Sequence, residues 1–286
     1  MIHMYADDTQ IYVSFSVEHD QEAVIKLQNC IIDIRQWMMD NHLKLNDSKT
    51  EYLVIGMPHF TKQLSSVSSL VIGNSSVDAV PHAKNIGATL DSQLSMAQHI
   101  SAICKICYMY LHNISKIRLY LTEEAAARIV NALITSRLDY ANAILYGIPD
   151  YLLKRLQLVQ NNAARLVLRK KKRDHATPLL CQLHWLPIKF RIEFKLNLLT
   201  FKCLNQLAPK YLSDLIIPYV PSRSLRSSSM NLLTEKRARL KNAGDKSFSV
   251  AAPQLWNKLP DEVKCNTDLE SFKTALKTFY FKKAFY

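Results

Sequence analysis

The sequence predicts an α+β fold, in which a strand-containing first third is followed by helices over most of the remaining chain. Short segments before residue 94 alternate apolar and polar side chains, whereas apolar residues recur at helical spacing from about Ser95 onward. The charge changes at the same place, because residues 1–98 hold 6 Lys/Arg and 11 Asp/Glu but residues 99–286 hold 31 and 13. We therefore expect parts with different roles, which we place at residues 1–94, 95–174 and 175–286.

Composition limits the class of protein. The formal net charge of +13 predicts a surface that attracts phosphate backbones or anionic lipid. No apolar run approaches the ~20 residues needed to span a bilayer, and no signal peptide is visible at the N-terminus. Six scattered cysteines in mostly apolar contexts indicate reduced, intracellular thiols. We expect an intracellular protein with no membrane partner; a membrane-surface or scaffolding role is an alternative that rests on charge and the aromatic tail.

The first part is expected to hold one long helix among short strands. Ile11, Val13 and Phe15 alternate with more polar neighbours, which predicts a β-hairpin whose turn carries the preceding aspartates. Apolar residues at helical spacing predict a helix over residues 19–42. Further strands are expected at residues 49–56, which end in a glycine, at 70–72 and at 85–91.

The second part predicts a helical bundle, because three amphipathic segments follow one another with short links. Thr122, followed by two glutamates, and Pro149 are typical of helix starts. The bundle helices are expected at residues 95–118, 122–146 and 150–169. The third part is expected to be basic and mostly helical, with one helix between Pro187 and Pro209 and others at residues 247–258 and 268–285.

Tyr5-Ala6-Asp7-Asp8 carries the strongest chemical signal. Paired aspartates on a turn suit Mg²⁺, a hard ion that prefers oxygen and usually keeps one or two protein carboxylates beside substrate phosphates. In a two-metal polymerase site, such carboxylates hold ions that activate a 3′-hydroxyl and stabilise the leaving pyrophosphate. The small Ala6 would let a primer end or a nucleotide approach. The alternative is a solvated acidic turn, where aspartate is common in any case.

The surroundings of this turn resemble the reverse transcriptases of non-LTR (LINE-type) retrotransposons, of the jockey or CR1-like kind. Residues 5–12 resemble motif C of that family. Residues 41–46 with 49–56 resemble its motif D, and residues 85–91 with 94–95 resemble its motif E, the primer grip. Segments that resemble regions after the polymerase core follow at residues 137–142, 184–188 and 252–260. The resemblance covers essentially the whole chain in the family's order.

The resemblance implies that residues 1–94 are the C-terminal half of a polymerase palm, built of a β-hairpin, a helix and antiparallel strands. It implies a thumb-like bundle at 95–174, followed by the C-terminal region. The implied activity is RNA-directed DNA polymerisation with Mg²⁺ as cofactor, on an RNA template with a DNA primer or duplex. Nucleotides are the small-molecule partners implied, and the implied location is the nucleus or the cytoplasm.

Residue roles follow from the resemblance where positions match. Asp7 would ligate the metal, with Asp8 as its supporting partner, and Tyr5 and Ala6 would bind nucleic acid. Lys49 would approach the leaving phosphate as a cation or acid; the alternative is a solvated lysine at a strand start. Gly87 would let the primer backbone pass close to its strand; the alternative is a simple bulge glycine.

One departure from the family limits these roles. The family also needs a motif A aspartate and a motif B segment that holds the nucleotide, both N-terminal to the hairpin. Only four residues precede Tyr5 here, and no other segment resembles a replacement. Two aspartates on one turn leave other Mg²⁺ ligands unsupplied. We therefore expect a truncated fragment or a mis-started gene model that is inactive alone, and the alternative is a nucleic-acid-binding remnant without catalysis.

A run of cations ends the third bundle helix and predicts sequence-independent binding to a nucleic-acid backbone. The alternatives are a solvated helix end, where cations are favoured, and a nuclear-import signal. The residues concerned are Arg165, Arg169, Lys170, Lys171, Lys172 and Arg173.

A zinc site is the remaining motif to weigh. Cys104-x-x-Cys107 and Cys181-x-x-His184 have ligand-like spacing. However, Cys104 and Cys107 share the apolar face of a predicted helix, so we expect them to pack in the core.

Overall fold

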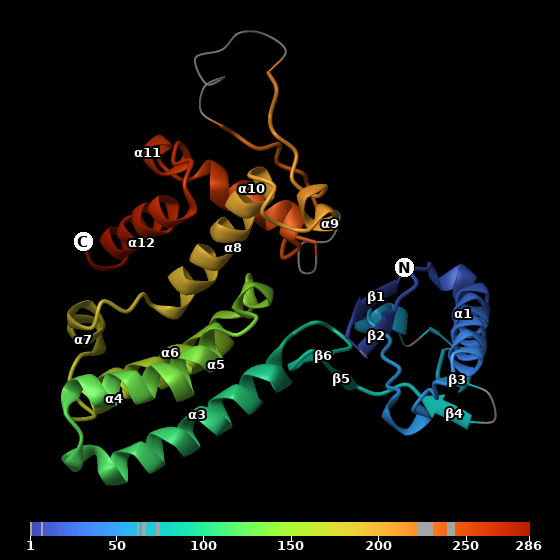
Figure 1. The fold of residues 1–286 in the computed structure, drawn as a ribbon, viewed down its shortest axis with the longest axis horizontal. Helices are drawn as coiled ribbons and strands as arrows, with labels where there is room; N and C mark the ends of the chain where they lie inside the picture. The colour runs from blue at the N-terminus through green and yellow to red at the C-terminus, as the bar shows by residue number, and fades with distance from the viewer. Residues whose placement is uncertain are drawn as a thin grey trace. The chain divides into compact units, whose positions relative to one another are not determined.

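The computed structural model describes residues 2–6, 8–61, 63–64, 67–72, 75–221, 231–238 and 244–286. It combines helices with small antiparallel sheets, which confirms the predicted α+β class (Figure 1). The chain forms two compact units, Met1–His99 and Ile100–Tyr286. The second unit contains both the predicted bundle and the predicted C-terminal region.

The first unit holds three two-stranded antiparallel sheets among its described residues. The predicted long helix is confirmed as α1, Asp20–Asp40, after a 3₁₀ turn at Val17–His19. A second 3₁₀ turn follows at Asp47–Lys49, and the short helix α2 at Pro58–Thr61. The strands are β1 Ile2–Tyr5, β2 Asp8–Ile11, β3 Ser69–Ile72, β4 Ser75–Asp78, β5 His82–Asn85 and β6 Ala88–Asp91.

The predicted N-terminal hairpin is confirmed, although its second strand is shorter than expected. β1 pairs with β2 so that Ile2 lies opposite Ile11 and Tyr5 opposite Asp8. Residues 12–16, which alternate like a strand, have no regular structure. β1 has only four residues, and its first residue, Ile2, pairs with Ile11. Residues 12–16 therefore have no residue of β1 with which to pair.

The predicted strand at residues 49–56 is wrong. Tyr52 makes a single parallel bridge with Ala79, and its carbonyl accepts a hydrogen bond from the Val80 amide at 2.8 Å. Four residues later the Gly56 amide donates to the Ser92 carbonyl at 2.9 Å. Because the segment bonds to two different stretches of chain, it forms no continuous ladder. It is also half-buried rather than buried.

The strand predicted at residues 70–72 is confirmed as β3, and its exposure alternates as a half-buried strand requires. Leu70 and Ile72 are each 2% exposed, whereas Val71 between them is 57% exposed. The strand predicted at 85–91 is instead a tight hairpin of β5 and β6. Ile86 and Gly87 are its two turn residues, with φ of 40° and 78°, the left-handed conformation that such turns require.

The second unit begins with the three predicted bundle helices. α3 is Ala97–Ile117, followed by a 3₁₀ turn at Arg118–Tyr120. α4, Glu123–Val130, begins where predicted, since the Thr122 hydroxyl accepts a hydrogen bond from the Ala125 amide at 3.2 Å. A π-helical segment, Asn131–Thr135, continues it into α5, Ser136–Asp139. α6 is Asp150–Val167.

The expected extension of the second bundle helix to residue 146 is wrong. Helix α5 ends at Asp139, and Ala141 adopts a left-handed φ of 50° before a short 3₁₀ helix, Asn142–Leu145. The Asp139 carboxylate is bound by the Arg191 guanidinium, whose Nε donates at 2.8 Å. This ion pair fixes the end of α5 against the helix that contains Arg191, α8, Ile188–Leu204.

The helices after residue 187 form a second core, whereas the helix at residues 176–182 packs against α6. The helix predicted between Pro187 and Pro209 is confirmed as α8, Ile188–Leu204. Phe272 lies at the centre of this core, with its ring centroid 4.2 Å from that of Phe201 and 5.8 Å from that of Trp256. The other helices are α7 Ala176–Gln182, α9 Lys210–Ser213, α10 Phe248–Asn257, α11 Asp261–Lys264 and α12 Leu269–Phe285.

Candidate nucleic-acid interface

The Tyr-Ala-Asp-Asp segment lies at the tip of the β1–β2 hairpin. Tyr5 is the last residue of β1 and 65% exposed, and Asp8 opens β2 as an exposed residue. Ala6, between them, has a φ of 53°, a left-handed conformation that is unfavourable for a residue with a Cβ. Asp7 lies outside the described residues, so its predicted metal-ligating role stays a prediction.

The β5–β6 hairpin is joined to this first hairpin. The Gln10 side chain in β2 donates a hydrogen bond to the side chain of Asn85, the last residue of β5. Gly87 therefore lies in a turn that begins one residue after this contact. Its φ of 78° gives a conformational reason for glycine that is independent of any primer.

Lys49 is positioned by another element. It ends the 3₁₀ turn Asp47–Lys49 and has an exposed side chain. That turn is held to α1 by an ion pair between Arg35 and Asp47.

The carboxylates of residues 7 and 8 have the oxygen donors that Mg²⁺ prefers. In the part of the chain that the structure describes, no three His, Cys, Asp or Glu side chains gather as metal ligands would. A metal at this turn would therefore need ligands from bound nucleotides, water or other protein segments.

The cations after α6 divide into two groups. Arg169 has a left-handed φ of 50°, and its guanidinium donates to the carbonyls of Arg118 and Leu119 at 3.2 Å and of Leu121 at 3.0 Å. Arg165 donates through Nε and Nη2 to the carbonyl of Asp174 at 3.0 and 2.9 Å. These two arginines hold the backbone in place.

The other four cations, residues 170–173, are exposed. The loop that carries them is fixed at both ends, because the Lys170 amide donates to the Arg165 carbonyl at 2.9 Å and the Lys171 amide to the Asp174 carboxylate at 2.7 Å. A fixed loop with four exposed positive charges suits binding to phosphates.

Arg118 is a feature that the sequence reasoning missed. It is 6% exposed, and it donates to the Leu166 carbonyl at 2.9 Å, to Leu121 at 2.7 Å and to Val167 at 2.5 Å. It thus satisfies backbone groups at the end of α6. The sequence gives no signal for this role, because its two partners in α6 lie 48 and 49 residues away.

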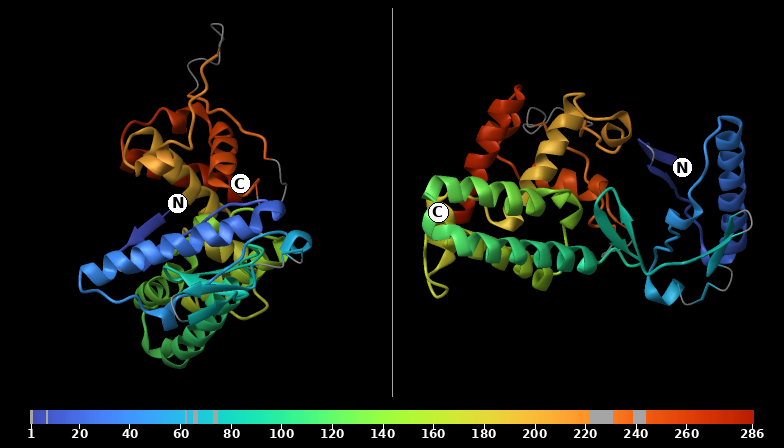
Figure 2. Two further views of the ribbon diagram at one scale, coloured as in Figure 1. Left: turned by 90° about the vertical axis from the view of Figure 1, so that its right-hand side faces the viewer. Right: turned by 60° about the horizontal axis from the view of Figure 1, so that its bottom comes forward.

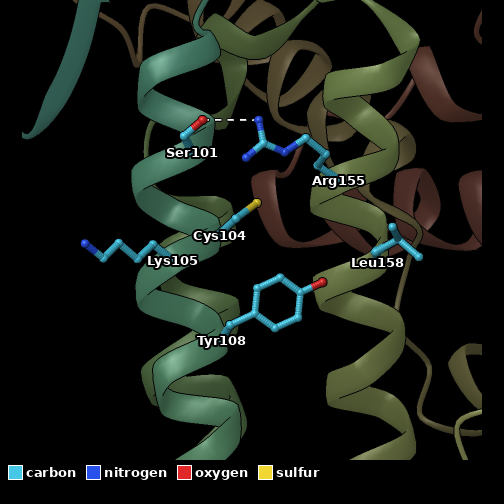
Figure 3. A pocket seen from close by; sticks show the side chains of 6 residues that line it. All are labelled: Ser101, Cys104, Lys105, Tyr108, Arg155 and Leu158. Atoms are coloured by element: carbon cyan, nitrogen blue, oxygen red, sulfur yellow. Dashed lines mark hydrogen bonds between the residues drawn. The ribbon is translucent and has the colours of Figure 1, made fainter.

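A shallow hollow of about 330 Å³ lies between α3 and α6. Figure 3 shows that the Tyr108 ring lies between the two helices and that Cys104 points into the same space. Arg155 on α6 donates to the Ser101 hydroxyl on α3 at 3.1 Å. Lys105 borders the hollow, but its ammonium group is directed away from α6 in Figure 3. The hollow therefore combines an aromatic ring with cations at its rim.

The cysteines of α3 pack in the core, as predicted. Cys104 is 5% exposed and Cys107 is fully buried, and burial raises the pKa of the Cys107 thiol to about 11. Cys181 is half-buried, and His184 stacks on Phe281 with ring centroids 5.3 Å apart.

Comparison of this chain with protein-family models, curated proteins and solved structures finds no match. Among the described helices, none is both long and apolar enough to cross a lipid bilayer.

Proposed function

We propose that this chain is part of the reverse transcriptase of a non-LTR retrotransposon, an RNA-directed DNA polymerase. In this proposal the first unit belongs to the polymerase palm and the α3–α6 bundle is thumb-like. The observation that carries the proposal is the hairpin register, in which Tyr5 at the end of β1 pairs with Asp8 at the start of β2. The order of the other motif-like segments along the chain supports the same assignment.

The residues would divide the work as follows. Asp7 and Asp8 would hold Mg²⁺, which supplies positive charge to the reacting phosphates when bound. Lys49 would add a cation near the leaving phosphate. The turn at Gly87, joined to the first hairpin through Asn85, would lie beside the primer. Lys170–Arg173 would bind the backbone of the template–primer duplex.

The 286 residues alone are expected not to polymerise, because two aspartates on one turn supply too few ligands for the metals. Primer extension with purified chain, Mg²⁺, an RNA template and a DNA primer tests this. The expected result is no extension, for the chain and for Asp7→Ala alike. Template-dependent synthesis that Asp7→Ala abolishes would show that the chain is catalytically complete.

A second candidate function is nucleic-acid binding without catalysis, which the exposed cations at residues 170–173 favour. If these four residues contact phosphates, the logarithm of the duplex binding constant should fall against the logarithm of salt concentration with a slope of about −3.6. Fluorescence anisotropy with a labelled duplex at several salt concentrations measures this slope.

A quadruple Gln variant of residues 170–173 should lose most of that slope and weaken duplex binding. The matched control removes four other exposed cations of the same unit, Lys195, Lys210, Lys277 and Lys282. The control lowers the net charge equally, so an equal effect would show that binding follows overall charge. Absence of duplex binding at low salt would exclude the binding function.

A further inference from the structure

The ends of α3 and α6 meet at one end of the bundle. The two helices run in the same direction (Figure 3), and the turn that follows α3 is bonded to the end of α6 and to Arg169. Arg118, directly after α3, donates to the carbonyls of Leu166 and Val167 in α6. Arg169, after α6, donates to the carbonyls of Leu119 and Leu121. The same end of the bundle is seen from two further sides in Figure 2.

Tyr120 lies between these two arginine-bound carbonyls and is 87% exposed. Its neighbours in sequence, Leu119 and Leu121, are both bonded to Arg169, and the Leu121 amide donates to the Arg118 carbonyl at 3.3 Å. The backbone of Tyr120 is thus held on both sides while its ring faces solvent. The Tyr120 ring contributes almost nothing to the core, so packing gives no reason for an aromatic residue at this position.

Lys170–Arg173 begin at the residue after Arg169, so four exposed cations follow directly from the residue that holds the backbone around Tyr120. The sequence separates Tyr120 from this run by some fifty positions, and the fold joins them. An exposed aromatic ring on a fixed backbone, joined through Arg169 to a run of cations, is a combination by which proteins bind single-stranded nucleic acid, with the ring stacking on a base and the cations bound to phosphates.

We infer that this end of the bundle binds single-stranded nucleic acid, with Tyr120 stacked on an unpaired base and Lys170–Arg173 bound to the adjacent phosphates. This inference rests on the nucleic-acid binding proposed above and adds the strand state that the site prefers. The Tyr108 ring in the hollow between the same two helices, near Arg155, is a second stacking position about 18 Å nearer the start of α3, at 1.5 Å per helical residue.

Nucleic acid fits this surface better than an anionic membrane does. A membrane-surface helix presents an extended apolar face beside its cations. Here the exposed apolar groups at the tip are Ile117 at the end of α3 and Leu119 and Tyr120 of the three-residue turn that follows it. Stacking needs only a single exposed ring, which Tyr120 provides.

The test uses the full chain and fluorescence anisotropy, with a labelled single-stranded RNA of about 16 nucleotides and a blunt duplex of the same sequence. Tyr120→Ala should weaken binding of the single strand about tenfold and change duplex binding less than about twofold. Tyr120→Phe should bind like the natural chain, because phenylalanine also stacks. The control is Tyr151→Ala, which removes a 62%-exposed tyrosine from the opposite end of α6 and should change neither affinity.

Three results would overturn the inference. The first is single-strand binding by Tyr120→Ala equal to that of the natural chain. The second is an equal loss on both probes with a lowered thermal unfolding midpoint, which would assign Tyr120 a structural role. The third is Tyr120-dependent binding to anionic phospholipid vesicles that exceeds binding to the single strand. Loss of duplex binding in all variants, the natural chain included, would instead contradict the proposed function itself.

Discussion

The two units differ in how far they bury their large apolar side chains. In Ile100–Tyr286, the large rings of Phe201, Phe272 and Trp256 are at most 2% exposed. In Met1–His99, the 21-residue helix α1 buries a single residue, Ala23, and leaves Trp37 59% exposed. Both regions have apolar residues at helical spacing, so periodicity predicts a helix equally well in each. Whether the apolar face is covered depends on neighbouring elements, which periodicity does not reveal.

The largest expected effect tests this contrast directly. Phe272→Ala should lower the free energy of unfolding of the second unit by about 3–5 kcal/mol, because it leaves a cavity between two stacked rings. Trp37→Ala should cost about 0.5 kcal/mol or less, as surface substitutions usually do. Hydrogen exchange measured by mass spectrometry on peptides from each unit, with and without urea, separates the two effects. A loss of stability for Trp37→Ala comparable to that for Phe272→Ala would show that the apolar face of α1 is covered in solution.

A smaller loss of stability is expected when an arginine that bonds to buried or half-buried groups is replaced. Arg118→Met leaves backbone carbonyls at the end of α6 without their donor, which should cost about 2–3 kcal/mol. The matched change in the first unit is Arg35→Met, which removes the half-buried ion pair with Asp47 and should cost about 1 kcal/mol or less. Urea unfolding of both variants measures these losses. Equal losses would mean that the bonds of a buried arginine in the second unit contribute no more stability than a half-buried ion pair in the first.

The core of the second unit should also respond to pH. Burial raises the pKa of Glu193, although Lys283 and Lys189 lower it in part and the Tyr280 hydroxyl bonds to it. The folded state therefore holds this proton more tightly than the unfolded state. Stability should fall as pH rises above the ordinary carboxyl value of 4.5 and through the raised value.

Glu193→Gln should remove that fall, so its gain in unfolding midpoint over the natural chain should be larger at pH 7 than at pH 4. Thermal unfolding at several pH values measures the gain. Asp268 should show the opposite pH dependence, because hydrogen bonds from Ser271 and other residues at the start of α12 lower its pKa. Asp268→Asn should lose its effect as pH falls. A gain for Glu193→Gln that does not change with pH would contradict the burial of a titrating carboxyl.

The smallest effect concerns the β5–β6 turn. Ile86 has a φ of 40°, which is unfavourable for a β-branched side chain, whereas Asn-Gly is the favoured pair in such turns. Ile86→Asn should therefore stabilise the first unit by about 0.5 kcal/mol, and Gly87→Ala should destabilise it by about 1 kcal/mol. Hydrogen exchange in peptides of β5 and β6 should be slower for Ile86→Asn and faster for Gly87→Ala than for the natural chain. A destabilising Ile86→Asn would mean that packing of Ile86 outweighs its backbone strain.

The sequence predicts the helices well because each carries its own signal. α3 and α6 follow from apolar spacing, and α4 from the Thr122 cap, which needs only local residues. The strands are harder, because pairing depends on distant segments. Ile86-Gly87 does not look like a turn, since isoleucine disfavours positive φ, and residues 49–56 look like a strand although their bonds go to two separate segments.

The candidate site divides in the same way. The hairpin at residues 5–8 and the exposure of residues 170–173 are local features and follow from the sequence. The roles of Arg118 and Arg169 do not, because arginine is usually exposed and their carbonyl partners lie on distant turns. The neighbourhood of Tyr120 could not be predicted for the same reason, since it exists only where α3 and α6 end together.

The shared end of α3 and α6 has an electrostatic consequence. Parallel neighbours place the negative ends of two helix macrodipoles side by side, each equivalent to about half an elementary charge. Antiparallel neighbours avoid this repulsion by alternating their ends. Here the Arg118 guanidinium bonds to carbonyls at the end of α6, and the Arg169 guanidinium bonds to carbonyls of the turn that follows α3. They neutralise the paired dipoles and so allow two long helices to pack in the same direction.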